Sequence, residues 1–310
     1  MVVAAAPPQY FPAELDTLGQ VAHNPAEQLK KKAKRKAITI FLADKLIELN
    51  GPNTKAYNIM KFCNSTLRQR DQELKSEYCK NRLCLVCNSI KTANLINGYL
   101  PELEKFQNPY FVTLTIKAVE GRFLVSAINK MQKNIRAINK HLTKYHGFKL
   151  KGIRKLEINY NLKQDTYNPH FHIITDGLQH AAYFLHEWLK KNPYSDDHAQ
   201  DIRRADHKSL KELFKYTSKL ISKDGNIHPD KIDKIYSALK RKRVIQPFGI
   251  KKFVDEDARE KTNYEHLTPD NAVWEYSVEN FDWINHQTGE YLAQYEPDED
   301  ILELYGSYRL

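Results

Sequence analysis

The chain has 310 residues, and its content of 41% hydrophobic and 11% aromatic residues excludes wholesale disorder and predicts a sizeable core. The formal net charge of +10 is unevenly distributed, because residues 262–310 contain eleven acidic residues and one basic residue, Arg309. Residues 1–261 therefore carry a formal charge of +20. Such a surplus is expected of a protein that contacts a phosphate backbone, although a generally basic, well-solvated surface is the other interpretation.

The N-terminal sequence MVVAAAPPQYFP has neither the positively charged leader nor the apolar run of a secretory signal. No stretch of the sequence has the apolar length of a membrane span. We therefore expect a cytoplasmic protein without a membrane partner. In that reducing compartment, cysteines bind metals or stay free more often than they form disulfides.

Five segments are predicted along the chain. Residues 1–55 form a basic N-terminal tail, mobile through the run KKKAKRK at 30–36, followed by a short helix at 37–49. The other four segments are a four-cysteine module at 56–100, a main domain at 101–225, a basic helical extension at 226–261 and an acidic, aromatic C-terminal segment at 262–310. The aromatic residues of the last segment predict that it covers a surface.

The second segment contains all four cysteines of the chain, namely Cys63, Cys79, Cys84 and Cys87. The final pair has the Cys-x-x-Cys spacing of a zinc knuckle, and four thiolates fill a closed tetrahedral zinc site, which is structural. The irregular spacing of the first two leaves open a zinc-free interpretation with buried or unpaired cysteines. With zinc bound, the module would brace a DNA-contacting loop that bears Arg68, Arg70, Lys80 and Arg82.

From residue 109 onwards, the pattern predicts a sheet covered by helices. Strands are expected at 110–116, 152–161 and 171–175, the last two joined by a turn at Asn168-Pro169. Apolar residues at helical spacing from 124 to 142 predict an amphipathic helix. Further helices are expected at 181–190, 208–222 and 229–243. This order predicts an α+β fold of the split-βαβ kind, with helices on one face of an antiparallel sheet.

His170 and His172 flank one apolar residue near the start of a predicted strand, so both imidazoles project from the same side of the sheet. Imidazole suits transition metals, and Glu157 on the preceding strand has the phase to face the pair as a third ligand. Such a set leaves coordination positions open for a substrate oxygen. A His-x-His pair by itself is more often a pair of surface polar residues, so its context decides between the two interpretations.

That context is the helix predicted at 208–222, where Glu212 and Tyr216 lie one turn apart at the edge of the apolar stripe. The basic face next to them is formed by Lys208, Lys211, Lys215 and Lys219. Because a phenol has a pKa of about 10, it needs such lysines, or a metal on its target, to act as a nucleophile. A boundary tyrosine that covers lysine stems is the alternative interpretation.

Three ordered motifs, FVTLTI (111–116), PHFHII (169–174) and ELFKYTSK (212–219), resemble those of HUH endonucleases, specifically the single-tyrosine, rolling-circle plasmid Rep family. The resemblance covers about residues 60–250 and includes the four-cysteine segment. It implies that Tyr216 attacks single-stranded origin DNA, leaving a 5′-phosphotyrosyl link and a 3′-hydroxyl that a polymerase extends. It also implies Mn²⁺ or Mg²⁺ on His170, His172 and Glu157, and a role in termination for Glu212.

The partners that follow from the resemblance are single-stranded and duplex origin DNA and host replication proteins such as a helicase and a polymerase. Two other hypotheses remain. One is a different HUH enzyme, a transposase or a conjugative relaxase. The other is a non-catalytic, zinc-containing DNA-binding regulator, which explains the charge and the cysteines but gives no reason for the ordered histidines, carboxylates and tyrosine.

Overall fold

The computed structural model describes residues 24–70, 73–145, 147, 149–214, 227–253 and 272–306. It divides into two compact units, each with its own antiparallel sheet. Of the described residues, those within 92–226 and 234–254 belong to the first unit, and those within 20–91, 227–233 and 255–310 belong to the second. The division falls within helices α4 (Leu85–Leu103) and α8 (Pro229–Leu239). None of the helices in the described ranges combines the length and apolar character that crossing a bilayer requires.

The sheet of the first unit has the strand order β7-β3-β6-β5-β8, and β4 pairs with β6. Its strands are β3 (Pro109–Thr115), β4 (Val119–Glu120), β5 (Gly152–Asn161), β6 (Thr166–Asp176), β7 (Asp201–Arg204) and β8 (Ile245–Phe248). The three strands predicted from alternation and β-branched residues correspond to β3, β5 and β6. Within the segment predicted as a basic helical extension, Ile245–Phe248 forms β8, an edge strand paired with β5.

The turn predicted at Asn168-Pro169 is wrong, because both residues lie inside β6, which begins at Thr166. The pairing explains how a proline fits there. The register with β3 ends at His170 and that with β4 begins at Tyr167, so neither strand pairs with Pro169 on that side. A missing N–H is tolerated at such a gap.

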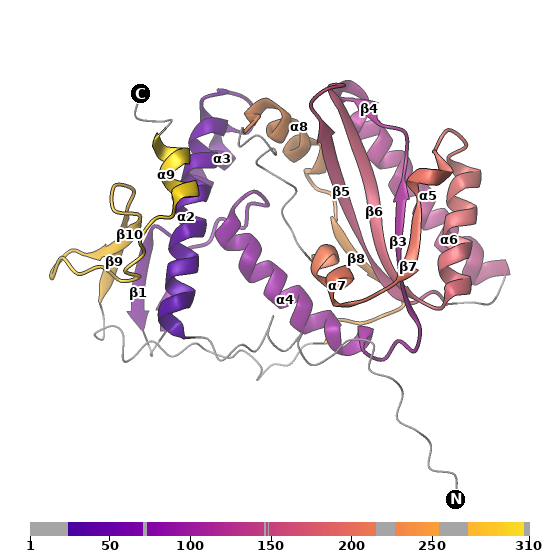
Figure 1. The fold of residues 1–310 in the computed structure, drawn as a ribbon, viewed down its shortest axis with the longest axis horizontal. Coiled ribbons are helices and arrows are strands. Elements are labelled where there is room, and N and C mark those ends of the chain that lie inside the picture. The colour runs from indigo at the N-terminus through magenta and orange to yellow at the C-terminus, as the bar shows by residue number, and fades with distance from the viewer. Residues whose placement is uncertain are drawn as a thin grey trace, which may run out of the picture. The chain divides into compact units, whose positions relative to one another are not determined.

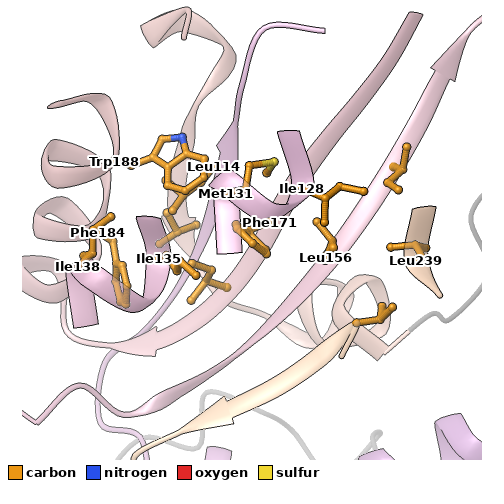
Figure 2. Packing of buried hydrophobic residues seen from close by; sticks show 14 of the residues in the cluster. Leu114, Ile128, Met131, Ile135, Ile138, Leu156, Phe171, Phe184, Trp188 and Leu239 are labelled. Carbon is orange, nitrogen blue, oxygen red and sulfur yellow. The ribbon is translucent and has the colours of Figure 1, made fainter. Parts of the chain in front are cut away.

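One face of this sheet packs against α5 (Leu124–Tyr145) and α6 (Leu178–Lys191). Figure 2 shows this core, in which side chains of both helices meet strand residues Leu114, Leu156 and Phe171. Trp188 of α6 is fully buried, and its indole nitrogen donates to the carbonyl of Thr115 at 2.7 Å. The helix predicted from the apolar spacing at 124–142 is therefore confirmed as core.

The opposite face packs against the end of α4 and against α7 (His207–Phe214), as the side view of the sheet in Figure 1 also shows for α7. Leu210 and Leu213 of α7 join a buried cluster that includes Phe111, Ile153 and Ile174 of the strands. The expectation of helices on one face only is therefore wrong. The physical reason is that successive residues of β3 and β6 are apolar, as at Ile173 and Ile174, and point to opposite faces. Both faces of the sheet therefore need to be covered.

The second unit has the strand order β10-β9-β1-β2. Its elements are α2 (Pro25–Ile47), α3 (Thr54–Lys61), β1 (Thr66–Arg70), β2 (Glu73–Lys75), β9 (Val273–Ser277), β10 (Asp282–Asn285) and α9 (Glu299–Gly306). Trp274 and Trp283 of the acidic segment are buried against Leu29, Ala33 and Leu67. The aromatic residues of that segment thus cover a surface, as the sequence predicted.

The N-terminal region differs from its prediction. Helix α2 begins at Pro25, behind the N-cap Asn24, whose side chain accepts from the N–H of Ala26 at 3.1 Å. It therefore includes the basic run at 30–36, and the expectation of a mobile arm there is wrong. Leu29, Ala33 and Ala37 recur every four residues along the basic run and are buried on one face of the helix.

Candidate active site

The predicted ligands Glu157, His170 and His172 lie together on one face of the first unit's sheet. Glu157 on β5 is paired directly with His170 on β6, and the alternation of β6 puts His172 on the same face. Their ligand atoms all lie within 4.8 Å of one another. The Nε2 atom of His172 is 3.8 Å from Oε2 of Glu157.

Both histidines are buried and held in one orientation. The pKa of His172 is lowered to about 3, mainly by burial and secondly by the neighbouring His170. Burial also lowers the pKa of His170. Neutral imidazoles are therefore present at pH 7. Nδ1 of His170 lies 3.0 Å from the carbonyl of Asn168, and Nδ1 of His172 lies 3.3 Å from Oγ1 of Thr113. With a proton on each Nδ1, both Nε2 atoms offer a lone pair, which fits a metal ion.

Lys155 is a buried neighbour of this cluster that the sequence analysis missed. Its side chain is 4% exposed, and its ammonium lies 2.6 Å from Oε2 of Glu157 and donates to the carbonyl of Glu212 at 3.0 Å. Burial raises the pKa of Glu157, but the charge and the hydrogen bond of Lys155 lower it by more. The pKa of Glu157 therefore lies below its usual range. Alternation along β5, which places Lys155 opposite His172, was the available signal.

Glu212 of α7 lies next to the same cluster. Its Oε1 atom is 3.5 Å from Nε2 of His172, and its side chain is 45% exposed. Its Oε2 atom accepts from Arg203 of β7 at 3.1 Å. Arg203 also donates to Oγ of Ser209 at 3.0 Å and lies 4.2 Å above the ring centre of Phe111. This arginine, also missed in the sequence, therefore connects α7 to the sheet face that carries the histidines.

The structure describes only some of the remaining predicted residues. Tyr216, Lys215 and Lys219 lie outside the described residues, as does the side chain of Lys211. Lys208 is exposed on α7. In the second unit, Arg68 and Arg70 are exposed on β1, whereas Arg82 is half-buried.

The four cysteines form a second cluster, in the second unit. All four Sγ atoms lie within 4.8 Å of one another, with 3.5 Å between those of Cys63 and Cys87 and 3.7 Å between those of Cys79 and Cys87. Zinc–sulfur bonds of about 2.3 Å place the sulfurs of a tetrahedral site about 3.8 Å apart. Backbone N–H groups also donate to the sulfurs, as from Cys79 to Cys63 at 3.3 Å. The donor set and its spacing therefore fit one tetrahedral ion.

Comparison with known proteins gives the family. The model of a family described as "Replication protein" matches residues 71–291, and the chain belongs to this family. Protein rep of Staphylococcus aureus is 30% identical over 189 residues, which are 52% of this chain and 81% of that protein. Protein rep of Streptococcus pneumoniae is 29% identical over 166 residues, 48% of this chain and about half (49%) of that protein. No solved structure matches the chain.

Proposed function

We propose that the chain initiates rolling-circle replication of a plasmid, as a single-tyrosine HUH endonuclease that nicks and rejoins single-stranded origin DNA. Its membership of the replication protein family supports the role in replication. The observation that carries the enzymatic proposal is the cluster of Glu157, His170 and His172 beside Glu212. Tyr216, the proposed nucleophile, follows Glu212 by four residues in the sequence.

Glu157, His170 and His172 would hold one divalent ion, Mn²⁺ or Mg²⁺. Two neutral imidazoles and one carboxylate form a three-ligand set, which leaves coordination positions open for substrate. When bound, the ion polarises the scissile phosphate and bears part of the negative charge of the transition state. Lys155 keeps Glu157 ionised and oriented, because it donates to one carboxylate oxygen.

The hydroxyl oxygen of Tyr216 forms a bond to phosphorus while the bond from phosphorus to the 3′ oxygen breaks. The phenol proton passes to a base, and the departing 3′ oxygen takes up a proton to become the primer end. The 5′ side stays attached to the tyrosine as a phosphodiester, so a 3′-hydroxyl can later reverse the reaction without ATP. Glu212 would activate water when replication ends, or otherwise take the place of a second tyrosine.

DNA contact is assigned to both units. Lys208, Lys211, Lys215 and Lys219 would neutralise phosphates near the nick. Arg68, Arg70 and Arg82 would contact duplex origin DNA beside a structural zinc ion held by the four cysteines. A host helicase and polymerase would then extend the 3′-hydroxyl.

The experiment compares His170→Ala with His198→Ala, a matched variant at a histidine whose side chain is 93% exposed. Each protein is incubated with a single-stranded oligonucleotide from the origin of its own replicon and Mn²⁺. We expect His170→Ala to lose nicking while its affinity in a gel shift stays within about twofold, because it removes a ligand of the catalytic ion rather than a DNA contact. Equal losses of binding and cleavage would contradict the proposal. A gel shift without cleavage by the wild type would favour the DNA-binding regulator instead.

A further inference from the structure

Lys36 of α2 is a fully buried cation next to the four cysteines. Its side chain has 0% exposure, and its ammonium donates to the carbonyls of Lys61 at 2.8 Å and Cys63 at 2.7 Å and to Oγ of Ser65 at 2.9 Å. All three acceptors are uncharged. Within the described ranges, no carboxylate forms an ion pair with Lys36.

A buried ammonium without an anion is costly, even when neutral acceptors satisfy its hydrogen bonds. The cysteines can supply that charge, because Lys36 is bonded to the carbonyl of Cys63, and the thiols of Cys63, Cys79 and Cys84 lie within electrostatic range of its ammonium. Four thiolates around one divalent ion carry a net charge of −2. A metal-loaded centre would therefore supply the missing anion, whereas four neutral thiols would not.

Lys32 adds a second cation on the same side of α2, one helical turn earlier. Its ammonium lies 5.9 Å from the ring centre of Tyr78, the residue before Cys79, and 5.9 Å from that of Trp283. The ammonium of Lys36 lies 5.5 Å from the ring centre of Tyr276. Two lysines thus match the two negative charges, and both ammonium groups lie within 6 Å of aromatic ring centres.

We propose that Lys36, assisted by Lys32, is the counter-charge of a dianionic four-thiolate zinc centre, so that zinc binding and the burial of α2 stabilise each other. This inference rests on the proposed zinc site and is independent of the proposed nicking reaction. Because such coupling is reciprocal, removing the lysine weakens zinc binding, and removing zinc weakens the packing of α2. In the metal-free protein the lysine charge is uncompensated, so removing the lysine costs less than it does in the zinc-loaded protein.

The test uses the full chain and compares Lys36→Met with Lys31→Met, an exposed lysine of the same helix. Zinc affinity is measured by competition with a chromophoric chelator, and thermal unfolding is followed with zinc and with excess EDTA. We expect Lys36→Met to bind zinc about 10- to 100-fold more weakly, as for other groups that support metal ligands, and Lys31→Met to stay within about twofold. Lys36→Met should lower the Tm of the zinc-loaded protein by clearly more than that of the metal-free protein.

An equal fall of Tm in both forms, with unchanged zinc affinity, would reduce Lys36 to a hydrogen-bonding residue and overturn the proposal. If Lys36→Met does not fold, hydrogen exchange of the wild type decides. Amides of α2 around residues 32–40 should be protected with zinc and lose that protection in EDTA; unchanged protection contradicts the coupling. A wild type that binds no zinc overturns both the zinc site and this inference, yet leaves the nicking assay to be judged on its own result.

Discussion

The two candidate metal centres of this protein differ in how they are built and in what they leave open. Glu157, His170 and His172 come from two paired strands, and they number three, so a bound ion keeps free positions beside the exposed carboxylate of Glu212. The four cysteines come from loops and from the start of α4; three are buried and one is half-buried. A complete, buried ligand set holds a fold together, whereas an incomplete set on a rigid sheet can admit a substrate.

The largest effect expected from this difference is on catalysis. His172→Ala should reduce the rate of origin nicking by about 10³-fold. The variant removes one of the three ligands, so the ion is no longer held in position beside the scissile phosphate. The Tm should change by only a few degrees. Single-turnover cleavage of a labelled oligonucleotide measures the rate; an unaffected rate would contradict the catalytic role of this centre.

Substitution in the four-cysteine centre should have the opposite result, with a large loss of stability and little loss of nicking. Cys84→Ser should lose the bound zinc and lower the Tm by about 10 °C, because zinc binding contributes to folding of the second unit. Nicking by the folded fraction at low temperature should persist. Metal analysis and calorimetry check the first two results, and a folded Cys84→Ser protein that cannot nick at all would remove the distinction between the centres.

A smaller effect is expected at Lys155, which orients a ligand without being one. Lys155→Met should raise the Mn²⁺ concentration needed for half-maximal nicking by about 10- to 100-fold, with much of the rate recovered at saturating Mn²⁺. Lys151→Met, at an exposed lysine just before β5, is the matched control. Equal Mn²⁺ titrations of the two variants would show that Lys155 does not position Glu157.

The smallest effect is on stability against pH. The pKa of His172 is about 3 in the folded protein and 6.5 in its reference state, so below pH 6.5 the unfolded chain binds a proton that the folded chain does not. This contribution to the free energy of unfolding is complete above pH 6.5 and falls by about 1.4 kcal/mol per pH unit as the pH drops towards 3. Urea unfolding at pH 7, 6 and 5, without added Mn²⁺ or Mg²⁺, should show a shallower fall for His172→Gln; identical slopes would contradict burial of a neutral imidazole.

What the sequence could predict was local. Alternation along a strand is a period of two residues, so it was enough to place His170 and His172 on one face and to bring Glu157 to them. Lys155 shares this alternation with Glu157 and could have been placed opposite His172. Arg203 was missed because its role depends on where α7 packs on the sheet, which no local pattern contains. Tyr216 lies outside the described residues, so its role stays a prediction.

The second unit was harder to predict, because its sheet joins distant segments. Thr66 of β1 pairs with Glu275 of β9, and no local period announces a partner so far along the chain. The apolar stripe of α2, which includes Leu29 and Ala33, was not recognised because a run of charged residues usually indicates a solvated segment. The division into five segments remains a prediction beside the two compact units.

The most direct measurement identifies the residue that carries DNA after cleavage. The wild-type protein is incubated with Mn²⁺ and circular single strands from its own replicon, digested with nuclease and protease, and analysed by mass spectrometry. We predict a nucleotide attached through a 5′-phosphate to Tyr216 and no attachment in Tyr216→Phe, which should still bind the DNA. A nucleotide on another residue, or nicking by the phenylalanine variant, would contradict the account.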